Sequence, residues 1–373
     1  MTIVVPGERS ARSAEEILRS IQSRHPYPLS AQLALTHRCN LECPHCSQAS
    51  NRRNGDELAI DDYVRLFEEL AALGVLKLTL TGGEATLRDD LPQIIEAASN
   101  RRFWSRLKTN GAALSSAYAD ICLNAGLTAV DVSLYDADAL GHDTFVGQKG
   151  AYENATRFAD RFQTQGGEVR ITVMAMNWNI SRIPDLIGMC ESHDFEYSVD
   201  AMVAPRTNGS LVPTALRADE EQLVALMRWQ YEKDPTRMPN HRPRQCGDTV
   251  CGAGRQSVQI QPNGDVLACE RLPIVLGNLR HLSFEAIWDA APFRQKLRNA
   301  RWGQLRQCAS CGDAWACSRC PGAALLERGD LFGTIPFECT ITRARILAIS
   351  AMDNAFRPLS AGRVVDGQPV SHS

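Results

Sequence analysis

Short apolar runs alternate with longer amphipathic stretches over residues 30–205. The short runs predict strands at residues 31–36, 76–81, 103–109, 128–134, 169–176 and 195–203. Between them, apolar residues recur at helical spacing and predict helices at residues 61–73, 91–100, 115–124, 151–165 and 183–193. Strands that alternate with helices predict an α/β protein with a parallel sheet and helices packed outside it.

The pattern changes on either side of this unit. Residues 1–29 form a polar lead-in with one short helical pattern at 14–23, and residues 206–245 read as a link with one helix at 219–229. A cysteine-rich domain is expected over residues 246–352, with a hairpin that turns at residues 262–265, a helical pair at 284–300 and a helix at 341–351. Residues 353–373 lack periodicity and predict a disordered tail.

Composition narrows the class of protein. The 373 residues are 44% hydrophobic and 22% charged with a net charge of −3, so we expect a globular protein without a nucleic-acid partner. No apolar run approaches the roughly 18 residues of a membrane-spanning helix, and no signal peptide is apparent. The thirteen cysteines cluster toward the two ends of the chain, which favours metal binding in a reducing cytoplasm over a disulfide framework.

A C-x3-C-x2-C motif follows the first predicted strand and comprises Cys39, Cys43 and Cys46. A [4Fe–4S] cluster takes four ligands, so three thiolates leave one iron open to a small molecule. The alternative is a structural zinc site in which His37 or His45 completes the set.

Further polar motifs stand where other predicted strands end. Gly82, Gly83 and Glu84 follow the second strand, residues 109–111 the third and residues 133–136 the fourth. Ligands of parallel α/β sheets bind at the carboxyl ends of the strands, so we expect these motifs to surround one site.

The cysteine motif followed by Gly-Gly-Glu resembles the radical S-adenosylmethionine (SAM) superfamily. The resemblance implies a partial (βα)6 TIM-like barrel, a [4Fe–4S] cluster on the three cysteines, and reductive cleavage of SAM to a 5′-deoxyadenosyl radical. It assigns the SAM amine to Gly82, Gly83 and Glu84, although Ala85 stands where the family often has proline.

The same resemblance places the ribose and carboxylate of SAM near Ser133 and Asp136, although a strand-end cap explains these two residues equally well. Met174, Met176 and Val203 stand where they could flank adenine, and a place in the core is the better expectation.

A second array of cysteines resembles the SPASM extension of radical SAM enzymes, with two residues rather than three in its last spacing. The resemblance implies two auxiliary [4Fe–4S] clusters, and zinc ribbons are the alternative. One cluster would use Cys246, Cys251, Cys269 and Cys320, and the other Cys308, Cys311, Cys317 and Cys339. Cys122 and Cys190 are then left over.

These resemblances imply an oxidoreductase that forms a new bond in a ribosomally made peptide or a protein side chain. Related enzymes mature sulfatases and the precursors of pyrroloquinoline quinone and mycofactocin. The expected partners are a precursor peptide, an external electron donor of the flavodoxin or ferredoxin type, and a separate protein that binds the leader peptide, unless the barrel face does so.

Glu270 follows Cys269 directly, where sulfatase maturases carry an aspartate base, and either takes a substrate proton or pairs with Arg271. Two other functions stay open. A peptide epimerase would need Cys122 or Cys190 as a hydrogen-atom donor, although both lie in helical patterns. An iron–sulfur electron carrier or scaffold would not need an open iron beside Gly-Gly-Glu.

Overall fold

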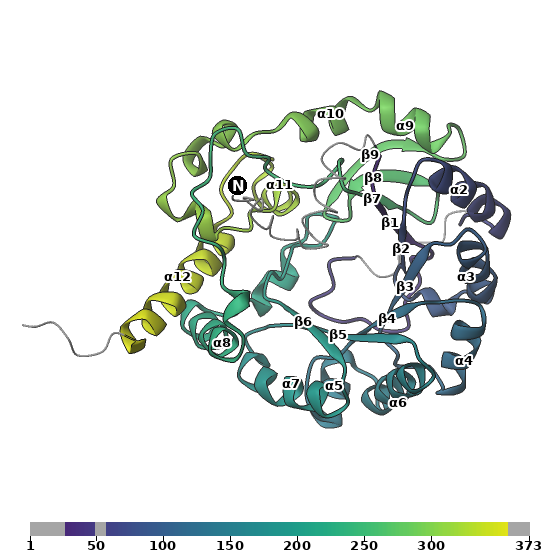
Figure 1. Cartoon of the computed structure of the whole chain (residues 1–373), viewed down its shortest axis with the longest axis horizontal. Coiled ribbons are helices and arrows are strands. Elements are labelled where there is room, and N and C mark those ends of the chain that lie inside the picture. Colours follow the sequence, from purple (N-terminus) through teal and green to yellow (C-terminus); the bar gives the residue numbers. More distant parts are fainter. Residues whose placement is uncertain (1–26, 49–56, 357–373) are drawn as a thin grey trace, which may run out of the picture.

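A computed structural model describes residues 27–48 and 57–356. The predicted helix at 14–23 and the tail beyond residue 356 lie outside these ranges. Six parallel strands form a curved sheet with helices along its outer side (Figure 1). The strands are β1 (Ser30–Ala34), β2 (Lys77–Thr81), β3 (Trp104–Thr109), β4 (Ala129–Ser133), β5 (Glu168–Met174) and β6 (Glu196–Asp200). The predicted partial barrel is confirmed.

The outer helices lie close to their predicted positions. They are α2 (Ile60–Ala72), α3 (Leu91–Ser99), α4 (Ala117–Asn124), α6 (Ala151–Thr164) and α7 (Ile183–Ser192). An additional helix, α5 (Ala139–Val146), escaped prediction because its hydrophobic pattern is weak. Its end signals are clear, however, since Asp138 accepts a hydrogen bond from the N–H of Gly141 and Gly147 ends the helix in the left-handed conformation.

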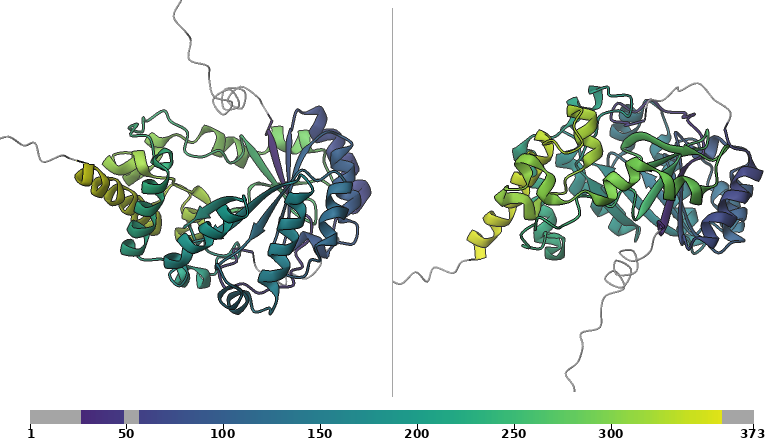
Figure 2. Two further views of the ribbon diagram at one scale, coloured as in Figure 1. Left: turned by 60° about the horizontal axis from the view of Figure 1, so that its bottom comes forward. Right: turned by 90° about the horizontal axis from the view of Figure 1, so that it is seen from above.

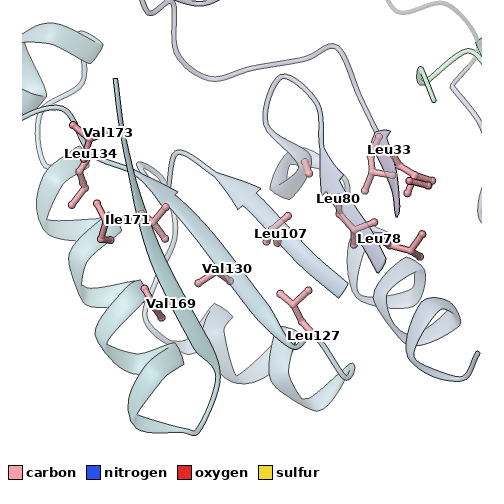
Figure 3. Close-up of a cluster of buried hydrophobic side chains, with 14 of the residues drawn as sticks. Leu33, Leu78, Leu80, Leu107, Leu127, Val130, Leu134, Val169, Ile171 and Val173 are labelled. Carbon is pink, nitrogen blue, oxygen red and sulfur yellow. The ribbon is translucent and has the colours of Figure 1, made fainter. Parts of the chain in front are cut away.

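The two faces of the sheet differ in character. Leucine, valine and isoleucine side chains fill the space between the sheet and the helices (Figure 3). The opposite, inner face is polar: along β4, Val130 and Val132 belong to this core, whereas Asp131 and Ser133 line a cavity. β4 is an interior strand, and its apolar and polar residues alternate between the two faces of the sheet. This alternation indicates that the inner face lines an open space instead of a packed apolar interior.

The cysteine-rich region shares this sheet. The predicted hairpin is present as β7 (Ser257–Ile260) and β8 (Asp265–Cys269), and a further strand, β9 (Leu272–Asn278), pairs with β8. β7 pairs with β1 in parallel, which makes one nine-stranded sheet in the order β6-β5-β4-β3-β2-β1-β7-β8-β9. The region predicted as a separate C-terminal domain thus continues the barrel sheet past β1.

The remaining helices are α8 (Glu220–Lys233), α9 (Phe284–Ala290), α10 (Pro292–Asn299), α11 (Pro321–Arg328) and α12 (Pro336–Phe356). α8, α11 and α12 lie on the side of the molecule opposite α2–α4, whereas α9 lies beside α2 (Figures 1 and 2). Short 3-10 helices are η1 (Ala85–Leu87), η2 (Ile180–Arg182), η3 (Val212–Leu216), η4 (Pro235–Arg237), η5 (Trp302–Gln304), η6 (Arg306–Cys308) and η7 (Gly312–Ala316).

The predicted link, residues 206–245, contacts the C-terminal helix. Its helix α8 packs along α12, and the Arg343 Nε atom lies 2.8 Å from the Glu220 carboxylate. α12 also begins earlier and ends later than its predicted range, 341–351. No helix among the described residues is both long and apolar enough to cross a membrane.

Candidate functional site

The loop with Cys39, Cys43 and Cys46 follows β1 and lies against the Gly-Gly-Glu turn after β2. The N–H of Gly83 donates to the carbonyl of Thr36 at 2.8 Å, and the N–H of Glu84 donates to that of Arg38 at 2.8 Å. Neither Gly82 nor Gly83 has room for a side chain. A Cβ atom on Gly82 would lie 2.4 Å from the Thr36 carbonyl oxygen. A Cβ atom on Gly83 would lie 2.2 Å from the Arg38 carbonyl oxygen. The glycines therefore permit a close approach that fixes the cysteine loop.

Glu84 connects this turn to the end of β3. Its carboxylate accepts hydrogen bonds from the Thr109 hydroxyl at 2.8 Å, the Asn110 N–H at 2.7 Å, and the N–H and hydroxyl of Thr86 at 3.2 and 2.8 Å. The side chain is only 2% exposed. Burial raises the pKa of Glu84, and these hydrogen bonds oppose the rise. Glu84 is therefore a brace between two strand ends, whether or not it also contacts a ligand.

The three thiols of the loop are partly buried. Burial, together with the nearby Cys46 and Cys39, raises the pKa of Cys43 to about 12. Asn110 reaches the same loop, with its Nδ2 atom 3.0 Å from the Asn40 side-chain oxygen and 3.9 Å from the Cys39 sulfur. All three strand-end motifs predicted to share a site are thus in contact with one another or with the cavity described next.

A cavity of about 420 Å³ lies on the inner face of the sheet, between the cysteine loop and the residues that follow β8. Its lining includes His45, Cys46, Ser47, Lys108, Asp131, Ser133, Tyr135, Arg170, Thr172, Met174, Ser198, Asp200, Glu270 and Arg271. The cavity is lined both by Cys46 of the N-terminal cysteine motif and by Glu270 of the C-terminal cysteine-rich region. Strand pairing between β1 and β7 is what brings them to one cavity.

The His45 side chain, a possible fourth ligand of a zinc site, lies in an aromatic environment. Its ring packs against Tyr135 and Phe145, with centroids 4.7 and 5.4 Å away, and burial lowers its pKa to about 4. Within the part of the chain that the structure describes, no three His, Cys, Asp or Glu side chains converge closely enough to hold one metal ion.

The predicted SAM-contact residues separate into two places. Ser133 lines the cavity, and its hydroxyl lies 3.3 Å from that of Thr172. Asp136 does not: it is 1% exposed, lies 3.0 Å from Arg182 and lines a different pocket beside α5. The placement of Asp136 therefore supports the strand-end structural interpretation. Strand β4 ends at Ser133, so the alternation that would place Asp136 no longer applies three residues later.

The methionines also divide. Met176 is fully buried in a small cluster with Leu41 and Val203, as expected for core residues. Met174 lines the cavity instead. Cys122 and Cys190 are both 0% exposed within the main core, which matches the expectation that they are buried thiols.

The C-terminal cysteines form two groups. Burial, together with the nearby Glu270, Cys320 and Cys251, raises the pKa of Cys269 to about 12. Burial also raises the pKa of Cys339, with Cys308 and Cys311 as further causes, and Cys308 has the same effect on Cys317. Cys251, Cys269 and Cys320 are thus neighbours in one group, and Cys308, Cys311, Cys317 and Cys339 are neighbours in the other. The eighth cysteine, Cys246, is exposed. Its backbone carbonyl accepts a hydrogen bond from the N–H of Gly303.

Glu270 faces the cavity and has a partner other than the one predicted. The Gln32 side-chain amide donates to its carboxylate at 2.7 Å, whereas Arg271 lies 3.3 Å from Asp200. Sequence reasoning missed the charged lining residues Lys108, Asp131 and Arg170. The available signal was their period-two spacing with apolar residues inside strands that are otherwise core.

Comparison with known proteins agrees with these motifs. A sequence model of the radical SAM superfamily matches residues 33–190, and a model of the SPASM iron–sulfur cluster-binding domain matches residues 251–312. The chain is 30% identical to the PqqA peptide cyclase of Xanthomonas euvesicatoria pv. vesicatoria over 324 residues, which cover 80% of this chain and 85% of that protein.

Solved structures share the fold. Streptococcus suis SuiB bound to S-adenosylmethionine superposes with a TM-score of 0.67 at 19% identity, covering 86% of this chain and 79% of SuiB. SuiB bound to its precursor peptide SuiA gives a TM-score of 0.66 at 18% identity, covering 88% of this chain and 82% of that one. With both motif sets, the fold and a relative that spans most of its length, the chain belongs to the radical SAM superfamily and carries a SPASM iron–sulfur domain.

Proposed function

We propose that this enzyme uses SAM to make a new bond in a ribosomally synthesised peptide, or in a protein side chain. The observation that carries the proposal is the single cavity lined by Cys46 of the first motif and by Glu270 of the second. A peptide placed there would lie between the SAM-binding loop and the auxiliary region. The names of the relatives support a peptide substrate, since one is a peptide cyclase and another was solved with a precursor peptide.

Cys39, Cys43 and Cys46 would hold the SAM-binding [4Fe–4S] cluster, and the Gly82–Glu84 turn and Ser133 would position SAM. Two auxiliary clusters would use the two groups of C-terminal cysteines, with Cys246 completing the first. When bound, SAM and the clusters supply a 5′-deoxyadenosyl radical for hydrogen abstraction and acceptors for the surplus electron. The chain's own part is to position the groups and to exclude water from the cavity.

Glu270 is the proposed base for the substrate. It reaches the cavity, and its hydrogen bond from Gln32 fixes the carboxylate without neutralising it. A carboxylate held by an amide remains able to accept a proton from a substrate group, which an ion pair with Arg271 would have hindered.

The proposed partners follow from the same chemistry. A one-electron donor of the flavodoxin or ferredoxin type would reduce the first cluster in the cytoplasm. A separate protein or the barrel face would bind a leader peptide.

A peptide epimerase is the weaker candidate. It needs a thiol beside the substrate, but Cys122 and Cys190 lie in the core between sheet and helices, where burial raises the pKa of each to about 12. Neither lines the cavity. The electron-carrier alternative gives no reason for a substrate-sized cavity beside the cysteine loop.

The experiment that tests the proposal is anaerobic reconstitution followed by reduction with SAM. Formation of 5′-deoxyadenosine, and a mass change in a peptide encoded beside this chain, are expected. Stoichiometric zinc without iron, or reduced protein that leaves SAM intact, contradicts the proposal.

A further inference from the structure

Two rows of polar side chains cross the inner face of the sheet at defined levels. Strand register places Lys108, Asp131 and Arg170 side by side on β3, β4 and β5, and we call them the charged row. Two residues closer to the carboxyl ends, register aligns Ser133, Thr172 and Ser198. All six line the central cavity. A molecule in this cavity therefore meets hydroxyl groups first and charge beyond them.

The charged row is cationic overall. Asp131 is 1% exposed and accepts from Arg170 through Nε at 2.9 Å and Nη2 at 2.7 Å. Arg106, two residues before Lys108 on β3, donates to the same carboxylate at 2.7 Å. One buried carboxylate thus serves two guanidinium groups. Asp131 therefore has no charge left to balance a third cation nearby.

That third cation is Lys108. Among the described residues, its ammonium group has no hydrogen-bond or ion-pair partner. Of the other acids that line the cavity, Asp200 pairs with Arg271 at 3.3 Å, and Glu270 accepts a hydrogen bond from the neutral Gln32 amide at 2.7 Å rather than from Lys108. The remaining cavity cations, Arg170 and Arg271, both have carboxylate partners. Lys108 is half-buried at the cavity wall, where its ammonium group can donate a charge-assisted hydrogen bond to an anionic ligand.

We infer that Lys108 binds a carboxylate of the peptide substrate and thereby selects acidic peptides. The inference rests on the proposed function. The carboxylate belongs either to an acidic side chain or to the free end of the chain, because the two present the same group to an ammonium. The hydroxyl row would then hold the polar atoms of the same residue. Binding would place that residue below the SAM-contact residue Ser133, on the side away from the strand ends.

The test measures binding of three tripeptides to the reconstituted, SAM-loaded enzyme by isothermal titration. One peptide has a central glutamate and both ends capped, the second has glutamine in its place, and the third is trialanine with a free C-terminal carboxylate. We expect one of the two acids to bind at least about tenfold more tightly than the glutamine peptide, as a charge-assisted contact typically gives. Which acid prevails identifies the source of the carboxylate.

The variant Lys108→Met should remove this preference, and Lys108→Arg should keep most of it. The matched control is Lys77→Met, which removes a lysine from the adjacent strand β2 that lies over Trp104 rather than in the cavity. This control should bind as the wild type does. Iron content and circular dichroism establish that each variant is folded.

Equal or undetectable binding of all three peptides to the wild type overturns the inference, as does a preference that survives in Lys108→Met. A loss of SAM affinity in Lys108→Met with the peptide preference intact also overturns it, because the bound carboxylate is then that of SAM. Formation of 5′-deoxyadenosine is scored separately. An enzyme that discriminates acids without cleaving SAM contradicts the proposed function alone, and one that cleaves SAM without discriminating contradicts only this inference.

Discussion

The two cysteine-bearing regions are built in opposite ways. The loop with Cys39, Cys43 and Cys46 is held by backbone hydrogen bonds to the Gly82–Glu84 turn, and that turn is tied to β3 through the Glu84 carboxylate. The region around Cys308 and Cys317 consists of short turns, η6 and η7, around a small hydrophobic cluster separate from the main core. Cys311 and Cys339 are exposed.

This difference indicates where folding energy comes from. The first loop is shaped by protein–protein hydrogen bonds and can adopt its geometry before a cofactor binds. The second region is built from short 3-10 turns rather than from longer helices or paired strands. Metal binding in a region of this kind supplies part of the folding energy. The first region is therefore expected to be preorganised and the second to depend on iron.

Removal of iron should give the largest effect. Anaerobic chelation is expected to abolish SAM cleavage and to remove amide protection over residues 306–320, while β2–β5 keep theirs because the main core holds them. Hydrogen exchange followed by mass spectrometry measures both. Protection that falls equally in both regions, or in neither, contradicts the comparison.

Gly83→Ala should break the preorganised loop itself. Its Cβ atom would lie 2.2 Å from the Arg38 carbonyl oxygen, so the turn and loop must move apart. We expect the loss of about four irons per chain, one cubane cluster, and of SAM cleavage. The control is Gly188→Ala in α7, where a Cβ atom meets nothing within 4 Å and helix propensity favours alanine by about 1 kcal/mol. Full iron content in Gly83→Ala would show that the loop is not held by this contact.

Replacing Cys308 and Cys311 with alanine should separate the roles of the two regions. Neither residue lines the central cavity, so the variant should still cleave SAM to 5′-deoxyadenosine. The peptide product should vanish, because the surplus electron of the substrate has no acceptor. Circular dichroism and iron content come first, since this region is the one expected to need metal for folding. A folded variant that turns over peptide normally would assign these cysteines a structural role.

Glu84→Gln should have a smaller effect on both stability and ligand binding. The Glu84 carboxylate accepts four hydrogen bonds, and the substitution replaces one of its two oxygens with an NH2 group that cannot accept. We expect the free energy of unfolding to fall by about 1.5–3 kcal/mol, which a lower Tm would show. If Glu84 also contacts the SAM amine, SAM affinity falls roughly ten- to a hundredfold. Thr86→Val is the matched control, since it removes one donor of the same brace. It should lower the Tm and leave SAM affinity unchanged.

Local patterns predicted most of the elements of the barrel, but they did not predict which strands pair over long range. The βα alternation located all six barrel strands, and strand-end logic brought Gly83, Asn110 and Ser133 to one side. Pairing of β7 with β1 was not predicted, because periodicity reports which face a residue occupies and not which strand lies beside it. The role of Asp136 stayed open between SAM contact and a strand-end cap for a related reason: beyond the end of β4 no alternation fixes the direction of its side chain.

The smallest predicted effect concerns the contact between α5 and the residues that support the cysteine loop. His142 is 1% exposed, its Nδ1 atom accepts from the N–H of Tyr135 at 3.3 Å, and the two rings stack with centroids 5.7 Å apart. Burial lowers the pKa of His142 to about 4, and Asp143 opposes the shift only partly. The folded protein thus keeps this imidazole neutral.

Below about pH 6.5 the unfolded chain therefore takes up a proton that the folded chain refuses, and stability falls until the pH reaches about 4. The loss amounts to at most about 3 kcal/mol. In His142→Gln, which keeps an acceptor for Tyr135 and cannot titrate, urea unfolding between pH 7.5 and 4.5 should show a correspondingly weaker pH dependence. His45, whose pKa burial also lowers to about 4, contributes equally to both proteins. His193→Gln is the control, because it makes the same substitution at an exposed position. Parallel stability curves for wild type and His142→Gln would show that the His142 imidazole is protonated in the folded protein, and that α5 packs on Tyr135 less tightly than the ring contact indicates.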